Sequence, residues 1–439
     1  MTVGLEIAVA PERLDEGTPE ERAAFGLFTI RTPHSSLTEG FDFYLKGLRQ
    51  GPLVASYHVA EWFAWNWWRL RWEPRSAAAG WSTAHRMSSI GEGYVWPNIT
   101  IFSDGVRTAL ISHPSVRPDA KPFRYVGALP VVVPSTLFEG AVDTFVPQIL
   151  GRLRDEGLAQ TNLDLLWRDV LTERADPDIA KRRRLEALLG RDADSVDDMA
   201  IEQLLADADR LGEAALGEVA ADSAQAREGA VLTAEALDDL AQAHGYAASP
   251  KSSVRLAPGT LLPRGADVAA WRLGAAAARA LREQEHLGRM SIASARLAEM
   301  AGTRLAALTA RGAGRTALSF ALDAGASASC IVLRSNWATG RRFDLARLIG
   351  DRLLAEHGAL HPATRAYTYR QKAQRSFAAE LLSPFEAVDE MLAGDYSQES
   401  QQDVAEHFDV SPMTVNTLLK NHGRLEREES EQDFDVAAA

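Results

Sequence analysis

The sequence predicts an α+β protein in three parts: a β-rich domain over residues 1–140, a helical region over 141–247 and a mixed domain over 263–425. Three observations support this division. Short runs of β-branched and aromatic residues, bounded by turn residues, concentrate in the first part. Amphipathic helical patterns dominate the second part, and a stretch rich in Pro, Gly and Ser at 249–262 predicts a linker. After this linker, short apolar runs alternate with helical patterns, which favours an α+β arrangement.

The first domain is expected to hold several short strands. Asp104–Gly105 is a dipeptide that favours a tight turn, so the two apolar runs that flank it are expected to form a hairpin. The strands that composition and alternation predict are Phe25–Thr32, Phe41–Lys46, Ile99–Ser103, Val106–Ser112 and Leu129–Val133.

A tryptophan-rich segment lies between these strands, where residues 60–72 read AEWFAWNWWRLRW. Helical spacing indicates a core helix that buries Phe63, Trp67 and Leu70. Trp62, Trp65 and Trp68 cannot all face the same core, so some of them are expected to contact another domain. Trp65 and Trp68 are the candidate anchors for a partner. A stacking platform for bases or another ligand is the alternative interpretation of this cluster.

Composition restricts the class of protein and its partners. The chain carries 60 acidic and 47 basic residues, for a net charge of −13, which opposes non-specific binding to nucleic acid. A protein partner is therefore favoured. The single cysteine, Cys330, excludes a disulfide framework and a cysteine-rich zinc site and suits a reducing compartment. No leader and no membrane-spanning apolar run is found, so a cytoplasmic location away from membranes is expected.

The helical region and the last domain show a readable order of elements. The region from 426 to 439 is acidic and is expected to be disordered. The helices that periodicity predicts are Asp164–Glu173, Met199–Val219, Ala293–Leu308, Arg341–Glu356 and Tyr369–Leu382, and the strands are Ala317–Ala321 and Ser329–Leu333. Pro384 is expected to mark the end of the last of these helices.

Three segments in this order carry a resemblance. They read SCIVLRSN at 329–336, RRFDLARLIGD at 341–351 and RSFAAELLSP at 375–384. This order resembles the ImmA/IrrE family of zinc metallopeptidases, whose helix has the form RRFxLAHExGH and is followed by FAAELLxP. The resemblance covers roughly residues 290–425 and implies a zincin-like C-terminal domain.

The residues that would perform the chemistry depart from the family pattern. The first zinc histidine falls on Arg347, the general-base glutamate on Leu348, the second histidine on Asp351 and the third ligand on Ala373. A catalytic zinc needs three protein ligands and a base beside its bound water. We therefore expect no catalysis, no zinc and no other cofactor.

Two further expectations concern the same helix. Arg347 and Asp351 lie four residues apart, so they are expected to form an ion pair on one helical face. His357 and His361 are also four apart and represent the alternative of a rebuilt metal site. Gly358 lies between them and no glutamate is suitably placed, which disfavours a zinc peptidase with unusual ligands.

Residues 404–423 also resemble a helix-turn-helix, with Ala405 and Phe408 on its first helix. The acidic residues between positions 395 and 423 outnumber Lys420, and this balance opposes docking on phosphates. Because the helix-turn-helix pattern is present despite this charge, a DNA-binding regulator is a second alternative. The side chains that would contact DNA in that case are Thr414, Asn416, Thr417 and Lys420.

The sequence as a whole favours a non-catalytic, peptidase-like protein that acts as a sensor, adaptor or regulator by binding a macromolecule. The resemblance implies a bacterial setting such as stress response, control of mobile elements or phage defence. The partner-binding surface is expected to combine Trp65 and Trp68 with Arg347. Residues 329–334 are expected to form a strand edge that holds the partner in the groove.

Overall fold

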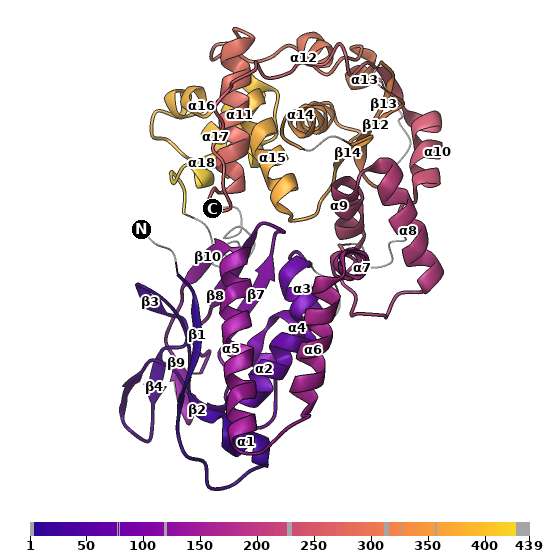
Figure 1. The fold of residues 1–439 in the computed structure, drawn as a ribbon. Helices are drawn as coiled ribbons and strands as arrows, with labels where there is room; N and C mark the ends of the chain where they lie inside the picture. The colour runs from indigo at the N-terminus through magenta and orange to yellow at the C-terminus, as the bar shows by residue number, and fades with distance from the viewer. Residues whose placement is uncertain are drawn as a thin grey trace. The chain divides into compact units, whose positions relative to one another are not determined.

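The structure is a computed structural model that describes residues 4–76, 78, 80–117, 121–225, 231–310, 316–325, 327–355 and 358–426. It confirms an α+β fold of helices and antiparallel sheets (Figure 1). Two compact units are present, residues 1–197 and 198–439. This division differs from the expected three parts, because helices from the region 141–247 join both units. All of the expected acidic tail except Glu426 lies outside the described residues.

In the described part of the first unit, the strands form three small antiparallel sheets. The first has the order β1-β2-β3, with β6 also paired to β2; the second has the order β10-β8-β7 and the third β5-β4-β9. Their strands are β1 Glu6–Pro11, β2 Phe25–Thr32, β3 Ser35–Ser36, β4 Gly40–Asp42, β5 Gly47–Arg49, β6 Leu53–Ala55, β7 Ile99–Ser103, β8 Arg107–Ser112, β9 Phe123–Tyr125 and β10 Pro130–Pro134. The hairpin of β7 and β8 around Asp104–Gly105 is confirmed. The strand expected at 41–46 is wrong beyond Asp42, because the Asp42 carboxylate accepts hydrogen bonds from the backbone amides of Tyr44 and Leu45 and so stabilises a turn.

The α-helices that the described residues of this unit form are α1 Pro19–Ala24, α2 Ser56–Trp65, α3 Trp67–Trp72, α4 Trp81–His85, α5 Ser135–Asp155, α6 Asn162–Ala175 and α7 Pro177–Leu188. The tryptophan-rich segment is two helices that meet at Asn66, whose side-chain amide donates to the Trp62 carbonyl. Capping explains the start of α6, where Thr161 and Asp164 form a reciprocal capping box. The predicted burial of Phe63, Trp67 and Leu70 is confirmed.

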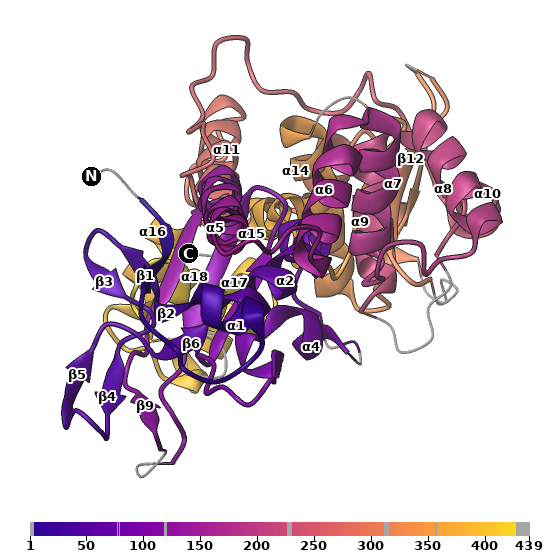
Figure 2. The same ribbon diagram turned by 60° about the horizontal axis from the view of Figure 1, so that its bottom comes forward.

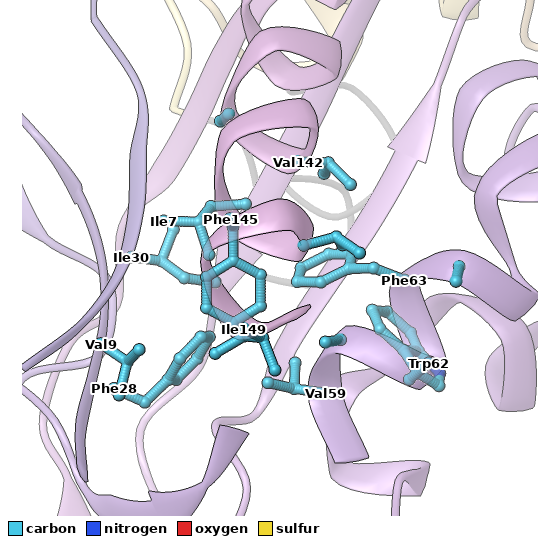
Figure 3. Close-up of a cluster of buried hydrophobic side chains, with 14 of the residues drawn as sticks. Ile7, Val9, Phe28, Ile30, Val59, Trp62, Phe63, Val142, Phe145 and Ile149 are labelled. Atoms are coloured by element: carbon cyan, nitrogen blue, oxygen red, sulfur yellow. The ribbon is translucent and has the colours of Figure 1, made fainter. Parts of the chain in front are cut away.

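The hydrophobic core of the first unit lies between sheet and helices. Figure 3 shows Val59, Trp62 and Phe63 of α2 beside aliphatic and aromatic side chains of α5, β1 and β2. Phe145 of α5 contacts both Phe28 and Phe63 edge to face, at centroid distances of 5.8 and 6.1 Å. Because α5 supplies so much of this core, residues 135–155 belong to the first unit.

The second unit holds one four-stranded antiparallel sheet, in the order β11-β13-β12-β14, and a set of helices (Figure 1). Its strands are β11 Tyr246–Ala248, β12 Ser319–Asp323, β13 Ser329–Val332 and β14 Leu360–Ala363. Its helices are α8 Asp198–Leu211, α9 Glu213–Ser223, α10 Ala234–His244, α11 Ala270–Gln284, α12 Ser294–Met300, α13 Ala306–Thr309, α14 Ala338–Leu354, α15 Tyr369–Leu382, α16 Phe385–Leu392, α17 Gln398–Phe408 and α18 Pro412–Asn421.

Two expected helices of this unit need correction, and strand β14 was not predicted. The helix expected at 199–219 is divided into α8 and α9 at Gly212, whose φ of 104° lies outside the helical region. The helix expected at 293–308 is divided into α12 and α13. The region around Pro362, for which no element was predicted, is the edge strand β14. Proline is tolerated there because an edge strand leaves alternate backbone groups outside the ladder.

Close helix packing in the second unit depends on glycine. A Cβ atom on Gly274 of α11 would lie 2.1 Å from the carbonyl oxygen of Ala373 on α15. A Cβ on Gly350 of α14 would lie 2.6 Å from the ring of Phe377, also on α15. These two contacts hold α15 against α11 and α14, and they thereby fix the position of the polar residues that α15 directs at α14.

We expect Gly274→Ala to lower the free energy of unfolding of the second unit by about 1–3 kcal/mol, since neither the added methyl nor the backbone carbonyl can move freely. Urea titration followed by hydrogen–deuterium exchange of α11 and α15 measures this loss. Gly140→Ala on α5 is the matched control, because nothing lies within 4 Å of its Cβ position. That control is expected to be neutral or stabilising by up to about 1 kcal/mol. Equal effects of the two substitutions would contradict the packing argument.

Candidate functional site

Arg347 and Asp351 lie one turn apart on α14 and are almost completely buried, with 3% and 1% of their surface exposed. The expected ion pair between them is not formed. Arg347 Nη2 donates to the Thr364 carbonyl and to Gln371 Oε1, both at 2.6 Å. Its nearest carboxylate is that of Asp344, at 3.8 Å. The pairing expected from helical spacing is wrong because β14, α15 and the preceding helical turn supply other partners.

Asp351 instead accepts four hydrogen bonds from β14 and α15. Arg370 donates to both carboxylate oxygens at 2.7 Å, in the bidentate geometry that suits a guanidinium. Gln374 Nε2 lies 2.5 Å from one oxygen and His361 Nδ1 lies 2.9 Å from the other. Each oxygen therefore has two partners.

A second carboxylate lies on the other side of His361, within ion-pair distance but beyond hydrogen-bond distance. His361 Nε2 lies 3.7 Å from Asp323 on β12, and Arg352 of α14 donates to both oxygens of Asp323. We call the set Arg370, Asp351, His361, Asp323 and Arg352 the carboxylate–histidine array. It alternates cationic and anionic groups, so each buried charge has an opposite neighbour.

The surroundings shift the ionisation of this array. Burial alone opposes the charged form of Asp351, but hydrogen bonds from Arg370 and His361 outweigh it and lower the pKa of that carboxyl below its usual value. Burial likewise opposes the imidazolium of His361, but its interactions with the Asp323 and Asp351 carboxylates outweigh burial and raise the pKa of His361 above 6.5. The array therefore favours a protonated histidine between two carboxylates.

The raised pKa of His361 predicts a pH dependence of stability. A pKa above the unfolded value of about 6.5 means that the stabilisation is complete below that pH and is lost as pH rises through the folded pKa. The free energy of unfolding of the second unit is thus expected to decline from about pH 6.5 upward. Urea titrations across this range, compared with His361→Gln, measure the effect. A slope that persists in His361→Gln would show that another group is responsible.

Arg347 has a less favourable environment than the array. Burial, reinforced by repulsion from Arg375, lowers the pKa of Arg347 to about 9. Its Nε is a buried donor without a hydrogen-bond partner. This residue occupies the position of the first zinc histidine in the resemblance, and its guanidinium would repel a dication there.

The edge of β14 is already occupied by a side chain. Gln371 Nε2 donates to the Pro362 carbonyl at 3.1 Å, and Gln371 Oε1 accepts from the Thr364 amide at 2.8 Å. One side-chain amide thus takes the place that the backbone of an added strand would take. The expected groove wall at 329–334 also needs correction, because residues 329–331 of β13 are paired on both sides, with β11 and β12.

Helix α9 contributes two buried carboxylates that sequence reasoning missed. Thr368 donates its hydroxyl to Glu218 at 2.5 Å, and the Arg365 amide donates to Asp222 at 2.6 Å. Burial raises the pKa of Glu218 above its usual value. The available signal was the spacing of Glu218 and Asp222, which puts two acids on one face of an otherwise apolar helix.

The remaining residues of the peptidase-like motif are buried or lie outside the site. Leu348 packs in the hydrophobic core of the second unit. Ala373 is buried on α15, about 100° around the helix from Gln374. Gln374, and not Ala373, therefore supplies the contact with Asp351. His357 lies outside the described residues, and His361 belongs to the array.

The candidate partner-binding residues have different environments. Trp65 is 66% exposed and lines a cavity of about 550 Å³ together with His58, Glu61 and Arg69. Trp68 is half-buried and donates its indole N–H to Glu173 at 2.6 Å. Arg347 is buried, so the expectation that it lies on a binding surface needs correction.

The helix-turn-helix geometry expected at 404–423 is present as α17 and α18, with Asp409 in the left-handed region between them. Thr414 is buried, which removes it from contact with a duplex. Asn416 donates to the Gln401 side chain at 3.2 Å, and Thr417 donates to the Met413 carbonyl. Lys420 is half-buried. This helix therefore presents few groups for reading bases.

Within the described ranges, no three His, Cys, Asp or Glu side chains are grouped to hold a metal ion. None of the helices in the described part of the chain is long and apolar enough to cross a membrane. Comparison of the chain with protein-family models, curated proteins and solved structures found no match. The resemblance to the zinc metallopeptidases therefore rests on the motif residues of α14 and α15.

Proposed function

We propose that this protein is a non-catalytic relative of the ImmA/IrrE metallopeptidases that acts by binding a macromolecular partner. The observation that carries the proposal is the carboxylate–histidine array. Its member Asp351 stands at the position of the family's second zinc histidine, and both oxygens of Asp351 already accept two hydrogen bonds each. Side chains of the protein, and not a metal ion, then neutralise the buried charges at the polar centre of the domain.

The residues present do not fit a catalytic zinc. Zinc bound at Asp351 would have to displace the Arg370 guanidinium and His361, and it would meet the cationic Arg347 one turn away. Leu348 offers no proton acceptor at the general-base position. The same residues that stabilise the buried array thus oppose both metal binding and activation of water.

A binding role agrees with the surface that remains. The edge of β14 is filled by Gln371, which disfavours a substrate-like chain at that strand. Trp65 is an exposed indole beside a cavity, and aromatic side chains of this kind anchor protein interfaces. We therefore assign a sensor, adaptor or regulator role, in the stress-response or defence setting that the resemblance implies.

Cleavage assays test this proposal. The purified chain, with zinc supplied, is expected to leave unfolded casein intact over a long incubation, because neither ligand set nor base is complete. Digestion is followed by gel electrophoresis, and Asp351→Ala is the control for contaminating protease. Zinc-dependent cleavage by the wild-type chain that disappears in Asp351→Ala would contradict the proposal and favour a peptidase with unusual ligands.

A further inference from the structure

The cavity beside Trp65 lies within the first unit and is lined by several of its helices. Residues of α2, α3, α4 and α6 line it, together with residues 89–92 and Asp192. Helix α2 lies beside α6 (Figure 2). The volume of about 550 Å³ falls within the range of ligand pockets, roughly 300–1,000 Å³. The cavity is therefore large enough for a small ligand or for a side chain of a partner.

One face of α2 supplies a wall of this cavity. His58, Glu61, Trp62 and Trp65 all line it. The last three follow His58 by three, four and seven positions, so the four side chains share one face of the helix. Trp62 is buried, whereas Trp65 is 66% exposed. The indole of Trp65 therefore offers aromatic surface to a group that enters the cavity.

Two carboxylates of the lining have no cation beside them. Glu61 accepts a hydrogen bond from the neutral Asn162 side chain at 2.9 Å, and it makes no ion pair with any described residue. Glu92 makes neither a hydrogen bond nor an ion pair through its side chain within the described ranges. It lies on a turn where Gly91, Glu92 and Gly93 have φ values of 79°, 55° and 77°. A residue other than glycine is uncommon in this conformation, yet the turn places a carboxylate at the cavity.

The other charged groups of the lining are already paired with opposite charges. Arg69 donates to Glu73 at 2.7 Å and to Asp192 at 3.0 Å, so one guanidinium serves two carboxylates. His58 lies 3.2 Å from Glu21. Three exposed arginines that are near in the sequence do not line the cavity: Arg86, Arg168 and Arg191. The cavity therefore carries an excess of negative charge beside an exposed indole.

We propose that this cavity binds an organic cation, namely the side chain of a lysine or arginine in a partner protein. The face of the Trp65 ring attracts a cation, and Glu61 and Glu92 supply the counter-charge. Nucleic acid and anionic bilayers are disfavoured, because the same carboxylates would repel their phosphate groups. The net charge of −13 likewise favours a basic partner. The proposal rests on the binding role proposed above and adds the chemistry of the partner.

Titration of the full chain with matched probes tests this proposal. A blocked Gly-Arg-Gly tripeptide is compared with the same tripeptide carrying neutral citrulline, and choline is compared with its uncharged carbon isostere. Binding is measured by ligand-observed NMR at matched ionic strength. Both cations are expected to bind, the tripeptide more tightly, and each neutral analogue about tenfold more weakly or not at all. Tighter binding of choline than of the tripeptide would overturn the assignment to a basic side chain.

Two substitutions locate the binding in the cavity. Trp65→Ala and Glu61→Gln are each expected to weaken binding of the arginine tripeptide about fivefold or more. Glutamine retains a side-chain oxygen for Asn162, so the second variant removes only the charge. Tyr44→Ala and Glu16→Gln, at exposed positions elsewhere in the first unit, are the matched controls and are expected to bind as the wild type does. Circular dichroism checks the fold of each variant.

Three results would overturn the assignment of a cation site. The first is binding of the neutral analogues as tight as that of the cations. The second is wild-type binding by both Trp65→Ala and Glu61→Gln. The third is binding of oligothymidylate or phosphatidylserine vesicles at Trp65 that is tighter than that of the tripeptide. Zinc-dependent cleavage would remove the proposed function without changing these titrations, so the two failures are distinguishable.

Discussion

Asp351→Ala is expected to lower the free energy of unfolding of the second unit by about 3–5 kcal/mol, the range for breaking a buried charge pair from one side. The substitution removes the acceptor of four hydrogen bonds and leaves Arg370 and His361 without their common counter-charge. His361 would retain Asp323, whereas the Arg370 guanidinium would remain half-buried beside an apolar methyl group.

Urea titration with hydrogen–deuterium exchange of α14 and α15 reports this loss for the second unit. Asp238→Ala is the matched control, since Asp238 pairs with Arg210 at 2.9 Å on the surface of the same unit. An exposed pair of this kind contributes about 0–1 kcal/mol. If Asp351→Ala costs no more than Asp238→Ala, the array does not stabilise the domain and the account of its role is incorrect.

Arg347→Met is expected to have the opposite sign and to stabilise the second unit by about 1–4 kcal/mol, as replacement of a poorly compensated buried charge can do. Arg347 has no carboxylate closer than 3.8 Å, and its Nε has no partner. In the variant, the two groups that accept hydrogen bonds from Arg347 each keep another donor. The Thr364 carbonyl still receives Arg375 at 3.3 Å, and Gln371 Oε1 still receives the Thr364 amide. Methionine fills similar space without a charge.

Arg342→Met on the same helix is the control for this prediction. Arg342 is as buried as Arg347, but it donates to the Ile292 carbonyl and the Ser294 hydroxyl and pairs with Asp409 at 3.0 Å. Its loss leaves a buried acceptor without a donor, so this variant is expected to be destabilised. Destabilisation of both variants by similar amounts, in the same exchange experiment, would show that Arg347 is better compensated than its geometry indicates.

Periodicity and composition predicted the main elements because these signals are local. Strands β2 and β7 and helix α15 match their predicted ranges. The turn at 43–46 was missed, because it depends on a side chain, Asp42, that satisfies backbone amides in place of a strand neighbour. The assignment of residues 141–155 to a separate region was not supported, because the packing of α5 on β1 and β2 leaves no local signal.

The candidate site was predictable in position but not in its connections. The motif located Arg347 and Asp351 on one helix, and both are buried there. The spacing rule for residues four apart then predicted an ion pair between them, because the rule considers only contacts within one helix. Arg370, Gln371 and Gln374 come from α15 and His361 from β14, so their contacts depend on how distant segments pack. Only the folded structure shows that these residues are the hydrogen-bond partners of Arg347 and Asp351.

Metal content tests the central claim most directly. The account predicts that the chain, produced with ample zinc and then dialysed, carries far less than one zinc per molecule by elemental analysis. Arg347 stands at the first ligand position, and Arg370 and His361 already bind the Asp351 carboxylate. His361→Ala and Asp351→Ala should leave that low value unchanged. About one zinc per chain in the wild type, lost in both variants, would contradict the account and show that Asp351 and His361 are metal ligands.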